Sequence, residues 1–127
     1  MKLKKFSLSL GTQVFRSFSE EARVRIIHLL LVEKELTITD LVSILDFTQT
    51  KTSRHIAYLK NSGLIASKNL DQWVFYSIKE EVTEIVSKMI IFLEKDIQLI
   101  KDFELCNIMN SNRVLSIHKA KAKELKY

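Results

Sequence analysis

Two short amphipathic segments joined by a tight turn constrain the fold of this chain more than any other feature. Thr37 and Asp40 have the spacing of a capping box, in which two side chains satisfy free N–H groups where a helix begins. Thr48 can cap a second helix, and Gly63 is suited to the position after its end because glycine readily adopts positive φ. With only a turn around Phe47 between them, the two helices form a helix-turn-helix pattern.

After Gly63 the periodicity changes from helical to β. Residues 64–68 and 73–78 are rich in β-prone side chains and flank a polar turn, so we expect a β-hairpin. The 127 residues include two glycines and no proline, which favours helices in the rest of the chain. The expected fold class is therefore α+β and mostly helical: a winged helix-turn-helix with a two-stranded β-hairpin wing.

Long helices are expected on both sides of this unit. Residues 10–18 have apolar side chains at helical spacing, and Ser19 is expected to cap the buried helix that follows. Ser77 and Glu80 form another capping-box motif, which predicts one long helix through about Met109. One stripe would cover the helix's own domain, but this helix has two, so we expect dimerisation through these terminal helices. The first stripe consists of Val82, Val86, Met89, Leu93, Ile97 and Ile100, and the second of Ile85, Phe92, Leu99 and Phe103.

The net charge of +5 is unevenly distributed. Residues 47–79 carry five basic residues against one acid, whereas residues 80–112 carry three against seven. Positive charge confined to one segment is typical of a surface that binds a polyanion. We expect residues 1–112 to form a DNA-binding and dimerisation domain and residues 113–127 to form a basic C-terminal tail.

The second helix of the pair has the side chains expected of a helix that reads DNA. A helical wheel places its apolar residues on one side, and on the other it places small and hydrogen-bonding residues, one arginine and no acid. Short side chains allow close approach to the major groove, and their polar tips can contact base edges. For His55, at the shoulder of the helix, a phosphate contact and simple packing are both open. The expected DNA-contacting residues are Gln49, Thr50, Lys51, Ser53, Arg54, His55 and Lys68.

Four motifs in order resemble the ArsR/SmtB family of winged-helix repressors. They are residues 14–27, residues 35–41, residues 49–59 together with 63–65, and residues 73–76. The resemblance implies dimers built through the first and last helices, and effector-driven release from operator DNA. It also implies DNA contacts from Gln49, Thr50, Ser53 and Arg54.

The chain departs from that family at the metal positions. Many relatives sense thiophilic metals through Cys-x-Cys in the helix before the recognition helix, where this chain has Thr37 and Thr39. Neutral, hard hydroxyl groups cannot replace thiolates for a soft metal. A second family site on the last helix retains Asp96, but its other three positions hold two amides and a methionine. We therefore expect no metal site and no cofactor.

Cys106 is the only cysteine, which excludes an intramolecular disulfide and a Cys-based metal site within one chain. Its apolar surroundings favour a core or interface role, with redox or metal sensing as the alternative. No apolar stretch is long enough for a membrane span and no signal-peptide pattern is present, so we expect a cytoplasmic protein.

The sequence as a whole predicts a transcriptional repressor that binds double-stranded DNA sequence-specifically, as a homodimer on a pseudo-palindromic operator. It contains no nucleophile–base pair, phosphate-binding loop or metal cluster, so an enzyme is not expected. The alternative is a winged-helix protein–protein interaction module that does not bind DNA. The sequence identifies neither the effector nor the operator.

Overall fold

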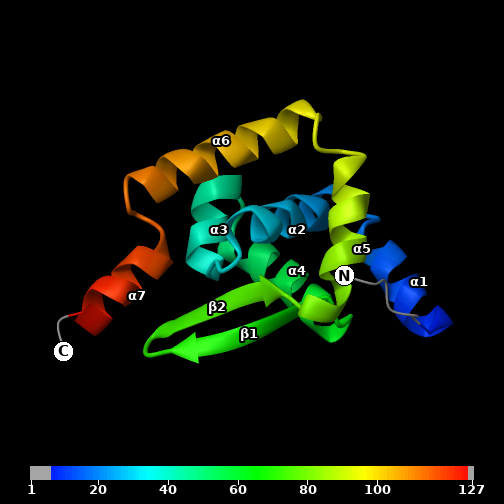
Figure 1. Cartoon of the computed structure of the whole chain (residues 1–127), viewed down its shortest axis with the longest axis horizontal. Helices are drawn as coiled ribbons and strands as arrows, with labels where there is room; N and C mark the ends of the chain where they lie inside the picture. Colours follow the sequence, from blue (N-terminus) through cyan, green and yellow to red (C-terminus); the bar gives the residue numbers. More distant parts are fainter. Residues whose placement is uncertain (1–6, 126–127) are drawn as a thin grey trace.

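The computed structural model of the chain describes residues 7–125, and the side chains of residues 7–121. Within these residues seven helices flank one β-hairpin (Figure 1). The elements are α1 (Leu8–Ser17), α2 (Glu21–Glu33), α3 (Ile38–Leu45), α4 (Gln49–Asn61), β1 (Ile65–Leu70), β2 (Trp73–Ile78), α5 (Glu80–Ile91), α6 (Ile97–Ser111) and α7 (Ser116–Leu125). None of these helices is long and apolar enough to cross a membrane.

The hydrophobic core is built around α2. Ile26, Ile27, Leu29 and Leu30 point in several directions from this helix, and all four are fully buried. The helix contacts α4, α5, α6 and β2. Figure 1 shows it in the middle of the molecule, between α6 on one side and the hairpin on the other. Through α2, the C-terminal helices are connected to the helix-turn-helix.

The two short helices α3 and α4 confirm the predicted helix-turn-helix. The Thr37 hydroxyl accepts a hydrogen bond from the Asp40 N–H at 3.1 Å, and the Asp40 carboxylate accepts one from the Thr37 N–H at 3.0 Å. The Thr48 hydroxyl accepts from the Lys51 N–H at 3.1 Å, where α4 begins. Gly63 lies just beyond the end of α4 with φ at 83°. These local signals fix both helices at the predicted positions.

The predicted hairpin wing is also confirmed. Strands β1 and β2 are antiparallel, in a register that pairs Ile65 with Ile78. Asp71 in the connecting turn has φ at 52°, which its short polar side chain tolerates. The Leu36 and Tyr76 backbones exchange two hydrogen bonds, of 3.2 and 2.8 Å, which attach the segment before α3 to the wing.

The prediction of one long C-terminal helix is wrong. Residues 92–96 separate α5 from α6, and the Asp96 carboxylate begins α6 by accepting a hydrogen bond from the Gln98 N–H at 2.8 Å. From there α6 folds back across α2, where the Arg25 guanidinium pairs with the Asp102 carboxylate at 2.9 and 3.0 Å. The Asp96 cap therefore begins a separate helix, and one face of that helix, α6, packs on α2.

Two predicted helix caps also differ from the structure. The N-cap of α2 is Glu20, not Ser19, whose hydroxyl instead donates to the Arg16 carbonyl at 2.6 Å. The N-cap of α5 is Lys79, not Ser77. Neither observed cap makes a side-chain hydrogen bond, and both helices have acidic residues in the first turn that complement the helix dipole.

The residues after α6 fold back onto α3. Leu115 and Ser116 are buried, and the Ser116 N–H and hydroxyl both donate to the Asp40 carboxylate at 2.9 Å. The beginning of the predicted basic tail thus packs on the helix-turn-helix. Residues 126–127 and the side chains beyond residue 121 lie outside the described residues. The division of the chain at residue 112 stays a prediction.

Candidate nucleic-acid interface

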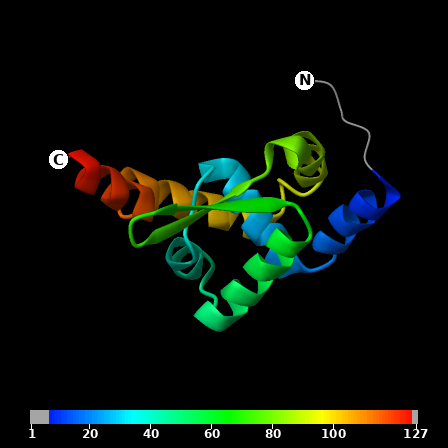
Figure 2. The same cartoon turned by 90° about the horizontal axis from the view of Figure 1, so that it is seen from below.

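Helix α4 has one buried and one exposed face, as the helical wheel predicts. Its buried residues are Thr52, His55, Ile56 and Leu59. The opposite face presents Gln49, Thr50, Arg54, Ala57 and Asn61 as exposed residues and Ser53 as a half-buried one. In Figure 2 the helix lies along one edge of the molecule, beside α3 and the hairpin. The exposed face is therefore open to a large partner.

The chemistry of this exposed face suits a groove of duplex DNA. Helix α4 contains no acidic residue, so no carboxylate on it would repel phosphates. Thr50 and Ser53 have short side chains that permit close approach, while Gln49 and Arg54 are longer and can donate hydrogen bonds. Gln49 opens the helix, at the end where groove-reading helices make base contacts.

Two further predicted DNA contacts lie outside this exposed face, Lys51 in the first turn of α4 and Lys68 on the wing strand β1. The Lys51 ammonium lies 4.1 Å from the centre of the Phe47 ring, a cation–π contact that holds it beside the turn. The Lys68 side chain on β1 is 67% exposed, with its ammonium 3.9 Å from the Glu35 carboxylate. Exposed ion pairs of this kind contribute little to stability, so Lys68 can exchange Glu35 for a phosphate at little cost.

His55 does not join the exposed face. It is 4% exposed, and its Nδ1 lies 3.7 Å from the Glu20 carboxylate at the start of α2. Burial lowers the pKa of His55, with Glu20 opposing the shift. Of the two interpretations open from the sequence, the structure supports packing: His55 helps to hold α4 against α2.

Arg23, to which no sequence motif pointed, supports α4 in the same way. Its guanidinium lies 4.0 Å from the centre of the Tyr58 ring of α4 and donates to the carbonyls of Ser17 and Arg16 at 3.2 and 2.9 Å. An arginine on an amphipathic helix normally suggests an exposed position, so no local signal could have identified this role.

The family's first metal position is occupied by a hydrogen-bond network. Thr37 caps α3, and its hydroxyl shares a hydrogen bond of 2.9 Å with the Ser116 hydroxyl, while Thr39 is exposed. Cys106, on α6, is fully buried, and burial raises the pKa of its thiol to about 11. The described residues contain no group of three His, Cys, Asp or Glu side chains placed to hold a metal ion.

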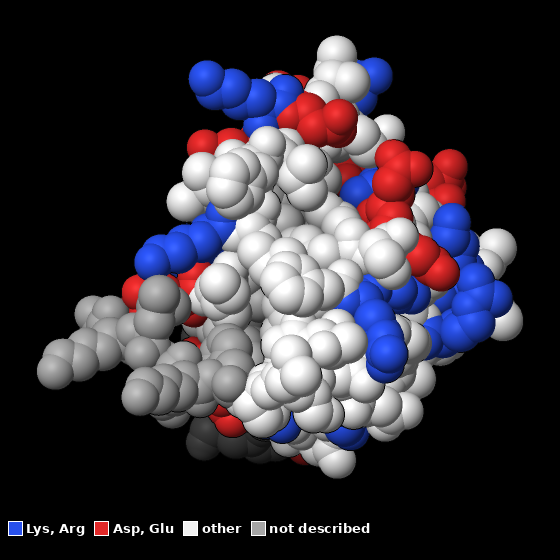
Figure 3. Space-filling model, turned by 90° about the vertical axis from the view of Figure 1, so that its right-hand side faces the viewer, with Lys and Arg blue, Asp and Glu red and all other residues white. Residues whose placement is uncertain are grey.

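A second exposed surface is apolar. Figure 3 shows the side of the molecule where α1 and α5 lie, with uncharged atoms over its centre and charged residues around its edges. Apolar residues of the chain that are large and exposed include Phe15 on α1, Ile91 at the end of α5, and Phe92 and Leu93 just after it. Phe92 is 87% exposed. By contrast, Val82 and Val86 of the first predicted stripe and Leu99 of the second are buried within the protomer, so only part of each stripe is available to a partner.

The fold and this interface together define a winged helix-turn-helix regulator of transcription. The sequence model described as "Bacterial regulatory protein, arsR family" matches residues 20–67, from the start of α2 to β1. The chain belongs to the ArsR family, which confirms the resemblance noted in the sequence.

Relatives of this chain include regulators of arsenic resistance. The arsenical resistance operon repressor of Escherichia coli K12 is 36% identical over 84 residues, which cover 66% of this chain and 72% of that protein. The arsenic resistance transcriptional regulator ArsR1 of Pseudomonas putida is 34% identical over 77 residues, or 61% of this chain and 60% of that protein. The chain therefore spans about three fifths of the length of that Pseudomonas relative.

Solved structures share the same fold. HlyU from Vibrio cholerae superposes with a TM-score of 0.60 at 27% identity, over 66% of this chain and 91% of that chain. The homodimeric DNA-binding domain Mb0332 from Mycobacterium bovis gives a TM-score of 0.61 at 18% identity, over 72% and 84%. At that lower identity the likeness is one of fold alone.

Proposed function

We propose that the protein represses transcription by binding a pseudo-palindromic operator as a homodimer, through α4 and the β-hairpin wing. The observation that carries this proposal is the exposed, acid-free face of α4, supported from behind by Arg23 and His55. The proposed contacts to base edges come from Gln49, Thr50, Ser53 and Arg54, and those to phosphates from Lys51 and Lys68.

The geometry of α4 favours insertion into the major groove. The groove is about 12 Å wide and admits an α-helix, whose N-terminal residues then face the base edges. Arg54 can donate two hydrogen bonds to a guanine, and Gln49 can pair with an adenine. We leave His55 out of the proposed contact set because its ring is buried and already faces Glu20.

A homodimer follows from the apolar surface over α1 and the end of α5. Exposed patches of this kind, rimmed by charges, are typical of protein–protein interfaces. Two-fold symmetry would present two copies of α4 to half-sites about one DNA turn, roughly 34 Å, apart. The E. coli relative is described as an operon repressor and the Mycobacterium neighbour as homodimeric, which supports both parts of the proposal. A repressor of this kind works where the DNA is, in the bacterial cytoplasm.

Operator selection with two matched variants tests the proposal. Genomic fragments retained by the protein are sequenced, and affinities are then measured on the enriched operator and on random duplex. Arg54→Ala should lose about ten- to hundredfold on the operator and much less on random DNA, because a base contact carries about 1–3 kcal/mol of discrimination. Lys68→Ala should weaken both duplexes about equally, because a phosphate carries no sequence information.

Lys88→Ala on α5 is the control, since Lys88 lies on a different element and pairs with Glu84 at 3.6 Å. Its affinity for both duplexes should match that of the unaltered protein. Failure to enrich any fragment would favour the protein-interaction alternative. Equal losses on both duplexes for Arg54→Ala would make Arg54 a phosphate contact and leave specificity to the other three residues.

A further inference from the structure

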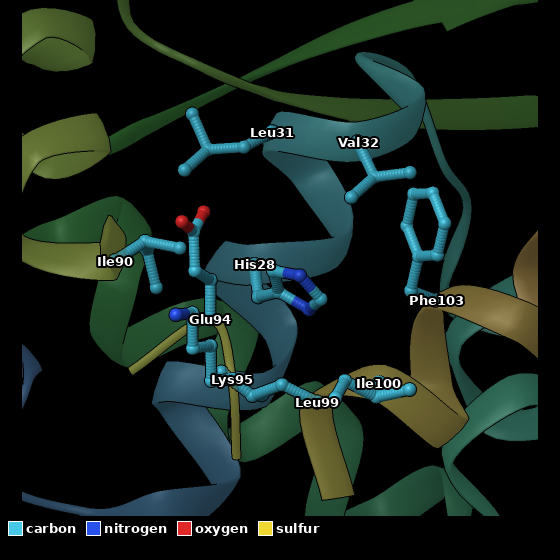
Figure 4. A pocket seen from close by; sticks show the side chains of 9 residues that line it. All are labelled: His28, Leu31, Val32, Ile90, Glu94, Lys95, Leu99, Ile100 and Phe103. Carbon is cyan, nitrogen blue, oxygen red and sulfur yellow. The ribbon is translucent and has the colours of Figure 1, made fainter. Parts of the chain in front are cut away.

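The bend between α5 and α6 creates a pocket that a continuous helix would not form. The pocket has a volume of about 480 Å³ and lies between α2, the end of α5, residues 92–96 and α6 (Figure 4). Its walls are mainly aliphatic, with the ring of Phe103 on one side. Pockets of ~300–1,000 Å³ with apolar walls and few polar groups are typical small-molecule sites.

His28 supplies a polar group inside this pocket. It is 8% exposed, and its Nδ1 is buried with no hydrogen-bond partner among the described residues. In Figure 4 its imidazole ring lies among the side chains that line the pocket. Buried polar atoms in native proteins are nearly always paired, so the unpaired Nδ1 sets this imidazole apart from an ordinary core histidine.

The protonation and surroundings of His28 restrict what that partner can be. Burial lowers the pKa of His28, against the opposing effects of Asp102 and Glu94, so the ring is neutral near pH 7. A neutral imidazole has one donor and one acceptor nitrogen. Glu94 and Lys95 line the same pocket and carry opposite charges, so the lining as a whole does not select an ion.

We propose that this pocket binds an uncharged, mainly apolar small molecule with one hydroxyl group, such as an alkylated phenol. The hydroxyl group pairs with the imidazole of His28, and it suits either tautomer because it can both donate and accept. The aliphatic walls and the Phe103 ring surround the apolar part of the molecule.

The position of the pocket makes such a molecule an effector of DNA binding, and this part rests on the proposed function. Helix α2, which carries His28, is in contact with α4 through the Arg23–Tyr58 and Glu20–His55 pairs described above. The pocket is also lined by the residues that set the bend between α5 and α6, next to the apolar surface proposed for dimerisation. A ligand there contacts elements that lead to both surfaces.

The test uses the full-length protein and three probes that differ in one group: 4-ethylphenol, ethylbenzene and 4-ethylbenzoate. Amide chemical shifts followed by NMR should change saturably for residues of α2 and α6 on addition of 4-ethylphenol. We expect 4-ethylphenol to bind about three- to tenfold more tightly than ethylbenzene, the range that one net hydrogen bond provides. The charged 4-ethylbenzoate should bind more weakly than 4-ethylphenol.

Two variants assign the effect to the pocket. His28→Phe should bind 4-ethylphenol and ethylbenzene equally, because the hydroxyl group loses its partner. Phe103→Ala changes a half-exposed residue that the fold tolerates, and it should weaken both probes while retaining the preference for the phenol. Lys101→Ala, at an exposed position of α6 outside the pocket lining, should behave like the unaltered protein.

Absence of saturable shifts with every probe would overturn the proposal, and it would indicate that a partner subunit's side chains fill the pocket. A phenol preference that survives in His28→Phe would overturn the role of His28. These measurements contain no DNA, so they fail or succeed independently of the repressor proposal. Saturating 4-ethylphenol should also change the operator affinity at least about threefold, and an unchanged affinity would overturn the effector role.

Discussion

Removing the Asp102 carboxylate tests whether its ion pair with Arg25 stabilises the packing of α6 on α2. The Asp102 side chain is 3% exposed and accepts hydrogen bonds from Nε and Nη2 of Arg25 at 2.9 and 3.0 Å. Gln98 donates a third, at 3.0 Å. In Asp102→Ala the Arg25 guanidinium loses both of its charged contacts while its side chain stays only 21% exposed. The variant therefore leaves a partly buried cation without its counter-ion.

The expected loss follows from that partial burial. Breaking a fully buried ion pair typically costs ~3–5 kcal/mol. Because Arg25 keeps some contact with water and with the Phe47 ring 4.9 Å away, we expect Asp102→Ala to lower the free energy of unfolding by ~2–3 kcal/mol. Arg25→Ala should cost a similar amount, and the double variant should cost less than the sum, with a coupling of ~1–2 kcal/mol.

Urea denaturation at one fixed protein concentration measures these losses, since a dimer's stability depends on its concentration. The Glu84–Lys88 pair, separated by one turn on the surface of α5, is the control: Lys88→Ala should cost less than about 0.5 kcal/mol. If the losses for Asp102→Ala and Arg25→Ala simply add, α6 is not docked on α2 as described, and the pocket beside it does not exist in that form.

Three further predictions concern buried groups and metals. With the pKa of the Cys106 thiol raised from 9.0 to about 11, iodoacetamide should modify the folded protein at least about a hundredfold more slowly than the urea-unfolded chain, and a ratio near one would contradict its burial. Burial in the folded protein lowers the pKa values of His28 and His55, so the unfolded chain binds protons first and the free energy of unfolding should fall as the pH drops below about 6.5. Urea midpoints measured at about pH 7.5 and 5.5 check this, and the fall should be smaller in His28→Phe. Stoichiometric zinc, cadmium or arsenite should leave DNA affinity unchanged in a binding titration, because the hydroxyls of Thr37 and Thr39 cannot replace thiolates. Release of DNA by one equivalent of metal would show a metal site elsewhere in the protein.

The helix-turn-helix could be predicted from the sequence because its signals are local. The Thr37–Asp40 capping box and the Thr48 cap each involve residues three apart, and Gly63 acts through its own backbone. The faces of α4 follow from helical periodicity alone. Such features do not depend on distant parts of the chain, so the structure places them where the sequence does.

The C-terminal half could not be predicted in the same way because its causes are non-local. Asp96 lies within a stretch of apolar helical periodicity, and its role as a cap depends on α6 turning back to Arg25, which is 77 residues from Asp102 in the sequence. The contact of Ser116 with Asp40 spans 76 residues. The pocket beside His28 forms only because the chain bends between α5 and α6, so no sequence motif could have predicted it.

The most direct measurement of the central claim is a salt titration of the protein with duplex DNA. If α4 and the wing bind DNA, Lys51 and Lys68 give at least four phosphate contacts per dimer, so log K should fall linearly with log salt concentration with a slope of about −3.6 or steeper. Lys68→Ala, which removes two of them, should flatten the slope by about 2. Absence of binding at about 50 mM salt, or a slope near zero, would contradict the account and leave the winged helix as a protein-interaction module.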